Sequence, residues 1–301
     1  MPALRALASA FPDHHRVLAA PAWLAPLVRH SATVHKVVDV APLAPLPASL
    51  HHADVAVNLH GRGPQSSRLL ADSGPRRLIA FAHPDVAETG GQPRWRPDEH
   101  EVRRWCRLLR ESGVPADPGD LHLEPPPVTP PPAAVGATLV HPGAAAAARW
   151  WPPERWAAVA AAEQAAGRPV VVTGGPGEAE RAAEVASRAR LPPAANLAGH
   201  TDLLELLAAV AVAERVVCAD TGVAHMASAV GTPSVVLFGP ASPAEWGPPK
   251  DGPHIALWAG YRGDPSAATV DPGLEAISTD DVLAAMARLP PRYQVGGAAT
   301  G

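Results

Sequence analysis

Hydrophobic and polar positions alternate along the chain in short blocks that predict strands and helices in turn. Val216 to Cys218 is a mainly β-branched run of the kind that fills a buried parallel strand. Residues 219–222 break this run where a helix can begin, and Gly231-Thr232-Pro233 ends that helix. Ser234 to Phe238 is the next strand-like run. The pattern therefore predicts a helix that connects two strands of one parallel sheet.

The same alternation occurs on both sides of a proline-rich segment. Residues 124–134 contain six prolines, which remove backbone donors and favour an extended chain. We therefore expect an α/β protein of two doubly wound, Rossmann-like domains that face a central cleft. A final helix, Thr279 to Leu289, is expected to pack back on the N-terminal domain, before a disordered tail over Gly296 to Gly301. The expected ranges are 1–125 for the N-terminal domain, 126–135 for the linker, 136–275 for the C-terminal domain, and 276–301 for the last helix and tail.

The N-terminal half opens on a helix pattern, Pro2 to Leu7, although an α/β domain normally opens on a strand. A glycine-rich loop, His60 to Ser66, follows a buried strand pattern and begins another helix. This loop could be a simple turn, or it could line a cleft, because Gly61 and Gly63 would let the backbone approach a ligand closely. Strand patterns in this half cover His15 to Ala20, Val34 to Val40, Asp54 to Leu59 and Arg77 to Phe81, and further helix patterns cover Pro21 to Arg29 and Asp98 to Ser112.

Composition narrows the class of protein. The 301 residues are 47% hydrophobic and carry a formal net charge of −4, which argues against bulk electrostatic binding of nucleic acid. Cys106 and Cys218 fall in patterns for buried helix or strand, so neither a disulfide framework nor a zinc site is indicated. No apolar run reaches the roughly 20 residues that span a bilayer. We expect a cytoplasmic protein with no cofactor, no metal site and no transmembrane segment, and peripheral contact with a membrane stays open.

Polar residues gather at the expected carboxyl ends of the strands in the C-terminal half. His225 follows Thr221 by four residues, which places its ring above the N–H groups and the positive dipole end of the helix that begins there. Arg149 could add a bidentate guanidinium, and together these groups suit a nucleotide diphosphate. Glu178 or Glu180 could then accept hydrogen bonds from ribose hydroxyls.

Each of these features also has a plain structural interpretation. Asp220 or Thr221 could be an ordinary N-cap, and His225 could be satisfied by neighbouring backbone. The loop from Thr173 to Glu178 ends a strand as loops in many α/β units do, and it lacks the G-x-G-x-x-G pattern of dinucleotide sites. Glu245 could be a charge at the rim or a contact to a sugar.

One combination of motifs matches a known family. It consists of Asp220-Thr221-Gly222-Val223-Ala224-His225, then Gly231-Thr232-Pro233, then Phe238-Gly239-Pro240. With His141-Pro142-Gly143 and Trp151-Pro152-Pro153-Glu154-Arg155-Trp156, the chain resembles the glycosyltransferase family 9 enzymes, which are heptosyltransferase-like and have the GT-B fold. The resemblance implies that the aspartate-to-histidine motif, a basic residue before the tryptophan-proline pair and a glutamate in the glycine-rich loop hold the donor. Our candidate donor-binding residues are Asp220, Thr221, Gly222, His225, Arg149, Thr173, Gly174 and Glu178, and the candidate acceptor-side residues are His60, Gly61 and Arg62.

The beginning of the chain departs from the family pattern. The resemblance implies a strand and a Leu-Gly-Asp loop just before the residues that match Pro2 to Leu7, and that loop carries the aspartate proposed as general base. Asp13 lies at the far end of the helix and does not replace it. The catalytic residue is therefore unknown. We expect that the start codon is placed too late; the alternative is a truncated protein that keeps donor binding and has lost turnover.

The function that the resemblance implies is transfer of a heptose-like sugar from a nucleotide-diphosphate donor, ADP-linked, to the hydroxyl of a glycan, a lipid or a small molecule. Such transfer is expected to invert the anomeric centre and to need no metal. Two alternatives stay open: a sugar-nucleotide epimerase or hydrolase of the same architecture, and a catalytically silent protein that binds nucleotide-sugars.

Overall fold

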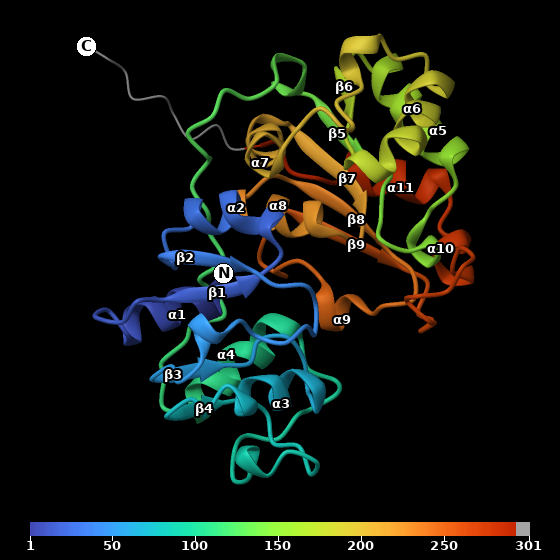
Figure 1. Ribbon diagram of the computed structural model, residues 1–301. Coiled ribbons are helices and arrows are strands. Elements are labelled where there is room, and N and C mark those ends of the chain that lie inside the picture. Colours follow the sequence, from blue (N-terminus) through green and yellow to red (C-terminus); the bar gives the residue numbers. More distant parts are fainter. Residues whose placement is uncertain (293–301) are drawn as a thin grey trace. The chain divides into compact units, whose positions relative to one another are not determined.

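The computed structural model describes residues 1–292, and the chain divides into two compact units, residues 1–121 and residues 122 onward (Figure 1). The division falls shortly before the predicted boundary at 125/126. Leu123 is already part of unit 2, because it is buried and its N–H donates to the carbonyl of Ala229. Ala134, within the predicted linker, is also fully buried. Leu123, just before the proline-rich segment, and Ala134, at its end, are thus buried in unit 2, which the composition of the segment does not reveal.

Unit 1 is built around an aromatic cluster at the end of β4 (Arg77–Ile79). Phe81 is fully buried, and its ring lies 5.0 Å from that of Trp95 and 5.8 Å from that of Trp105. Two helices of this unit, α1 (Pro2–Ala10) and α4 (Glu101–Glu111), pack against each other and supply Ala6, Leu108 and Leu109 to the same core. The remaining elements are β1 (Val17–Ala20), η1 (Ala22–Leu24), α2 (Ala25–His30), β2 (Lys36–Asp39), η2 (Ala48–Leu50), β3 (Val55–Val57), α3 (Gln65–Asp72) and η3 (Ala87–Thr89).

The strands of unit 1 occur where the sequence predicts them, with shorter bounds. Val17 of β1 pairs with Lys36 of β2, and Val55 of β3 pairs with Arg77 of β4, both in parallel register. Within the described residues these strands form two separate ladders. Each run of regular pairing is only three or four residues long. The parallel pairing agrees with the α/β prediction.

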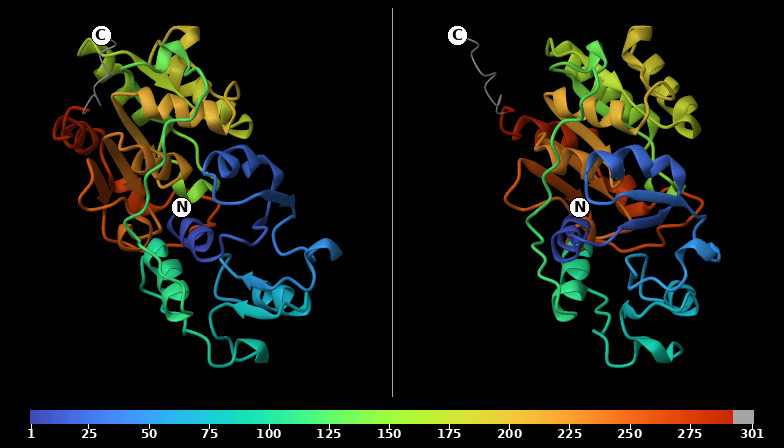
Figure 2. Two further views of the ribbon diagram at one scale, coloured as in Figure 1. Left: turned by 90° about the vertical axis from the view of Figure 1, so that its left-hand side faces the viewer. Right: turned by 60° about the vertical axis from the view of Figure 1, so that its left-hand side comes forward.

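Unit 2 is a parallel sheet in the order β6-β5-β7-β8-β9, with helices on both faces (Figures 1 and 2). Helices α5, α6 and α11 lie on one face and α7 and α8 on the other. Trp151 and Trp156 are fully buried on the α5 side, where their rings meet edge to face at 4.8 Å. The strands are β5 (Thr138–His141), β6 (Val170–Val172), β7 (Arg215–Ala219), β8 (Ser234–Phe238) and β9 (His254–Trp258). The helices are η4 (Pro132–Ala134), η5 (Ala147–Arg149), α5 (Pro153–Ala165), η6 (Pro176–Glu178), α6 (Ala179–Arg188), η7 (Pro193–Ala195), α7 (Leu203–Val212), α8 (Gly222–Val230), α9 (Pro243–Trp246), α10 (Pro272–Ala276) and α11 (Thr279–Ala287).

The last helix lies in a different place from the one expected. Helix α11 packs on α5, β8 and β9, all of unit 2, and it is the red helix beside the orange strands in Figure 2. Val282, Ala285 and Met286 are buried in the same core as Trp156. These apolar side chains cover the sheet of unit 2, whereas the sequence interpretation assigned them to the N-terminal domain. The expected tail, Gly296 to Gly301, lies outside the described residues.

No helix within residues 1–292 combines the length and the hydropathy that crossing a bilayer requires.

Candidate functional site

The N-terminus of α8 lies directly after β7, at the carboxyl edge of the unit 2 sheet. Thr221 occupies the N-cap position with extended backbone, but its side chain does not cap the helix. Its Oγ1 is buried and has no hydrogen-bond partner among the described residues. Gly222 and His225 are exposed, so the first turn is accessible to a ligand. At the other end, Gly231 adopts a left-handed conformation with φ of 69°, which confirms the predicted helix stop.

A pocket of about 440 Å³ opens at this helix terminus. One wall is polar and contains Arg149, Asp220, Thr221, Gly222 and His225. Arg149 comes from the end of η5, and its Nη1 donates to the backbone carbonyl of Asp220 at 3.1 Å. Its Nε is buried and has no partner within residues 1–292. The wall thus combines a positive charge and a hydroxyl whose hydrogen-bonding capacity is not used by the described residues.

The carboxyl group of Asp220 is strongly affected by its position. Burial raises the pKa of Asp220 to about 6, and the neighbouring Arg149 offsets only part of this effect. The backbone N–H of Asp220 donates to Leu237 in β8 at 3.0 Å, which fixes the residue between the two strands. A carboxyl with this pKa changes its charge near neutral pH, inside the pocket.

The other wall of the pocket, as we group its lining residues, comes from the segments after β8 and β9. It contains Pro240, Ala241, Glu245, Trp246, Arg262, Gly263 and Pro265. The Trp246 and His225 rings both line the pocket, with centroids 6.4 Å apart and planes tilted by 48°. Arg262 Nη1 lies 2.5 Å from Glu245 Oε1. The sequence left the role of Glu245 open and did not indicate Arg262, because an arginine four residues after a strand has no pattern that ties it to another loop.

The candidate residues at the ends of β5 and β6 form a neighbouring cluster and do not line this pocket. Thr173 is fully buried, and its hydroxyl lies 3.0 Å from His141 Nδ1. The Glu178 carboxylate accepts from the N–H of Gly175 at 2.8 Å and lies 3.7 Å from His141 Nε2. Burial lowers the pKa of His141.

Two glycines make room for this cluster. A Cβ on Gly143 would overlap the carboxylate of Glu178, and one on Gly174 would come within 3.2 Å of Glu178 Cβ. The structure therefore brings Thr173, Gly174 and Glu178 together at the strand ends next to the pocket.

The predicted acceptor-side residues lie on one loop of unit 1. The side chain of Asn58, which is 2% exposed, organises this loop: its Oδ1 accepts from the N–H of His60 at 2.9 Å. Its Nδ2 donates to the hydroxyls of Ser66 and Ser67 at 3.0 and 2.9 Å. The loop residues His60, Gly61 and Arg62 are exposed or half-buried. Sequence reasoning did not identify Asn58 as the residue that fixes this loop.

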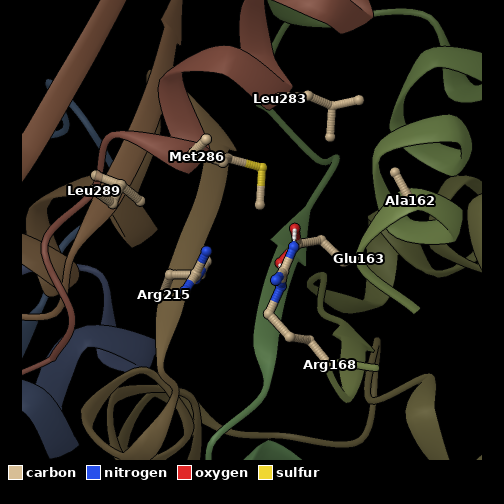
Figure 3. A pocket seen from close by; sticks show the side chains of 8 residues that line it. Ala162, Glu163, Arg168, Arg215, Leu283, Met286 and Leu289 are labelled. Carbon is tan, nitrogen blue, oxygen red and sulfur yellow. Dashed lines mark hydrogen bonds and ion pairs between the residues drawn. The ribbon is translucent and has the colours of Figure 1, made fainter. Parts of the chain in front are cut away.

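A second pocket, also of about 440 Å³, lies at the opposite, amino edge of the unit 2 sheet (Figure 3). Glu163, which is 2% exposed, accepts from Arg168 Nε at 2.7 Å and from the Thr138 hydroxyl at 2.5 Å. Burial by itself would raise the pKa of Glu163, but the hydrogen bonds from Arg168 and Thr138 outweigh it and hold this pKa below its usual range. Because this carboxylate is fully paired, we interpret the cluster as structural.

Within the described part of the chain, no group of three or more His, Cys, Asp and Glu side chains is placed to hold a metal ion.

Two heptosyltransferases are similar in sequence to part of this chain. Lipopolysaccharide heptosyltransferase 3 of Escherichia coli is 35% identical over 136 residues, which are 43% of this chain and 40% of that protein. The homologue from Escherichia coli strain K12 is 34% identical over 131 residues, 42% of this chain and 38% of that protein. The matched region thus spans about two fifths of the length of these relatives.

Solved structures share the fold over nearly the whole chain. A glycosyl transferase family 9 protein from Veillonella parvula DSM 2008 has a TM-score of 0.73 at 21% identity, covering 95% of this chain and 91% of that one. Escherichia coli ADP-heptose LPS heptosyltransferase II has a TM-score of 0.69 at 20% identity, covering 95% and 92%. An Escherichia coli heptosyltransferase solved with ADP has a TM-score of 0.66 at 17% identity, covering 95% and 93%. The predicted α/β fold of the GT-B heptosyltransferases is confirmed.

The family assignment rests on the sequence profile of glycosyltransferase family 9 (heptosyltransferase), which matches residues 93–266. This range includes every residue that lines the pocket, from Arg149 to Pro265. This match covers more than half of the chain. The chain belongs to glycosyltransferase family 9.

Proposed function

We propose that the chain transfers a heptose-like sugar from an ADP-linked donor to an acceptor hydroxyl, with inversion and without a metal ion. The observation that carries this proposal is the polar wall at α8, where Arg149 Nε and Thr221 Oγ1 are buried without partners in the described residues. Groups of this kind, beside a helix N-terminus, suit the oxygens of a diphosphate. The family membership and the relative solved with ADP support the choice of donor.

In this mechanism the acceptor oxygen attacks the anomeric carbon of the donor sugar. A new carbon–oxygen bond forms while the bond from that carbon to the diphosphate oxygen breaks, and the electron pair leaves with ADP. The proton of the acceptor hydroxyl passes to a general base, which the resemblance places on a loop that precedes the residues matching Pro2 to Leu7. Catalysis by unit 2 then consists of stabilising the negative charge that develops on the leaving diphosphate.

The residues of unit 2 have distinct proposed roles. Arg149 supplies positive charge, and Gly222, at the first turn of α8, leaves the helix terminus open to phosphate oxygens. Thr221 donates its hydroxyl, and His225 lies one turn further on the same face. Asp220 fixes the turn between β7 and α8 through its backbone bond to Leu237 of β8. Glu178, with Thr173 and Gly174 behind it, is proposed to receive the ribose hydroxyls, and His60, Gly61 and Arg62 are proposed to serve the acceptor.

Two measurements test this proposal. The first is isothermal calorimetry with ADP, GDP, UDP and dTDP, in which we expect ADP to bind most tightly. If none of the four nucleotides binds, the donor site is refuted. The second is release of ADP from ADP-heptose in the presence and absence of candidate acceptors. Release without an acceptor would identify a hydrolase, and binding without any release would identify a silent binding protein.

A further inference from the structure

The segments after β8 and β9 supply lining residues of the pocket to which the proposed diphosphate site assigns no role. Trp246, in α9, is 41% exposed although it lines the pocket. An exposed aromatic ring of this size keeps apolar surface in water, which costs free energy unless a ligand covers it. Pro240, Ala241 and Pro265 extend the apolar surface around the ring.

An ion pair lies on the same wall. Glu245 precedes Trp246 in α9, and its carboxylate pairs with Arg262 at 2.5 Å. The side chain of Glu245 is 21% exposed and that of Arg262 is 54% exposed, so both can be reached from the pocket. A carboxylate accepts hydrogen bonds and a guanidinium donates them. An aromatic face beside such a pair offers a sugar ring an apolar surface for its carbon–hydrogen face, together with a hydrogen-bond acceptor and a donor for its hydroxyls.

The strand order indicates in which direction a nucleotide-sugar would lie along the carboxyl edge of the sheet. Glu178 follows β6, the α8 terminus follows β7, and Trp246 follows β8, while the sheet order is β6-β5-β7-β8-β9. A nucleotide-sugar has its diphosphate between the ribose and the sugar. With the ribose on the β6 side and the diphosphate at α8, the sugar falls on the β8 side, beside Trp246.

We propose that Trp246, with the Glu245–Arg262 pair, forms the subsite for the sugar of the donor. This inference rests on the proposed function, because the diphosphate position sets the direction of the ligand. The Trp246 ring stacks on the carbon–hydrogen face of the sugar, and Glu245 and Arg262 bind its hydroxyls. The subsite determines which sugar is accepted, whereas the polar wall binds any nucleoside diphosphate that the ribose side admits.

The test compares two probes, ADP and ADP-heptose, by calorimetry on the full chain. Trp246→Ala is expected to weaken binding of ADP-heptose by about fivefold to tenfold, as the loss of one aromatic contact predicts, and to leave ADP binding within twofold of the wild type. Trp246→Phe should recover most of the loss. Glu245→Gln should weaken ADP-heptose alone, because a neutral amide is a poorer acceptor for hydroxyls.

The matched control is Trp23→Ala, which removes an exposed tryptophan of unit 1 and should change neither affinity. Equal weakening of ADP and ADP-heptose by Trp246→Ala would overturn the sugar subsite, because the ring would then contact the nucleotide. An unchanged affinity for both probes, with a raised KM for the acceptor, would also overturn it and would assign the wall to the acceptor. Failure of the proposed function looks different, since the wild type would then bind neither probe.

Discussion

Each edge of the unit 2 sheet carries a buried carboxyl group and an arginine, but within residues 1–292 only at the amino edge do the two side chains form hydrogen bonds with each other. At the amino edge, Glu163 receives hydrogen bonds from Arg168 and Thr138, and its pKa is lowered despite burial. At the carboxyl edge, Arg149 donates to a backbone carbonyl, and burial raises the pKa of Asp220 to about 6. The pockets at the two edges have the same volume, about 440 Å³. Pocket size therefore does not separate the structural cluster from the proposed ligand site, whereas the pairing of the buried charges differs between them.

The largest effect is expected at the amino edge. Glu163→Ala leaves the buried Thr138 hydroxyl without its acceptor and opens a cavity where the Glu163 stem lay, while the partly exposed Arg168 can be solvated. We expect the free energy of unfolding to fall by about 2 to 4 kcal/mol. Urea denaturation followed by circular dichroism measures this change. Glu184→Ala is the control, because its pair with Arg188 is exposed on α6 and should contribute less than about 1 kcal/mol. Similar losses in the two variants would contradict the structural role of Glu163.

At the carboxyl edge, replacement of the buried carboxyl group of Asp220 should stabilise the protein. The folded-state pKa of Asp220, about 6, lies above the unfolded value of 3.8, so ionisation of Asp220 opposes folding. This penalty is absent well below pH 3.8, grows as pH rises from 3.8 to the folded pKa of about 6, and is complete above it. Asp220→Asn removes it, and we expect the ligand-free protein to gain on the order of 2 to 3 kcal/mol above the folded pKa.

Urea denaturation at pH 5, 6.5 and 8 tests this prediction, with Asp13→Asn as an exposed control. The gain in Asp220→Asn should rise from pH 5 to pH 6.5 and change little from there to pH 8. A gain that is constant with pH, or a loss at pH 8, would show that the carboxylate is paired in solution and that the contrast between the two edges is wrong. Glu163 should show the opposite dependence, because a lowered pKa gives stability that is lost as pH falls through the folded value.

Arg149→Ala should separate binding from stability. We expect ADP affinity to fall about tenfold to a hundredfold, since a charge-assisted hydrogen bond to phosphate contributes about 1.5 to 3 kcal/mol. Calorimetry with ADP measures the loss, and Arg188→Ala, an exposed arginine of α6, is the control. Unchanged ADP affinity in Arg149→Ala would remove this residue from the donor site.

The smallest effect is expected at Gly143. A Cβ at this position overlaps the Glu178 carboxylate, which must then turn away from the N–H of Gly175. Gly143→Ala should lower stability by about 1 kcal/mol, the contribution of one hydrogen bond. Thermal denaturation measures this, and Gly177→Ala is the control, because nothing lies within 4 Å of a Cβ added there. Equal melting temperatures in both variants would show that the Glu178 contact contributes nothing.

The sequence predicts the carboxyl edge well because its signals are local. A β-branched run, a polar break and a glycine stop define β7, α8 and Gly231 without information from elsewhere in the chain. The N-cap position of Thr221 follows from the same pattern. Its unpaired hydroxyl does not, because burial of Oγ1 depends on residues that are distant in sequence.

Local sequence patterns do not predict features that depend on tertiary packing. Arg262 meets Glu245 only because the segments after β8 and β9 lie together, and α11 covers the unit 2 sheet because its apolar face fits beside α5. An amphipathic pattern states that a face is buried and does not state where. The match of the family profile to residues 93–266 confirms the resemblance, whereas the roles of individual residues stay predictions.

Strand β7 joins the two edges, since Arg215 lines the pocket beside Glu163 and Asp220 follows the last residue of the same strand. The strand spans roughly 13 Å, and sites that far apart without shared partners usually contribute additively to stability. With the donor bound at the carboxyl edge as proposed, stability and donor affinity can therefore be engineered separately. A variant with a strengthened amino edge could carry redesigned donor specificity at the carboxyl edge, and the stabilising change would compensate for the destabilisation that redesign of a binding site usually brings.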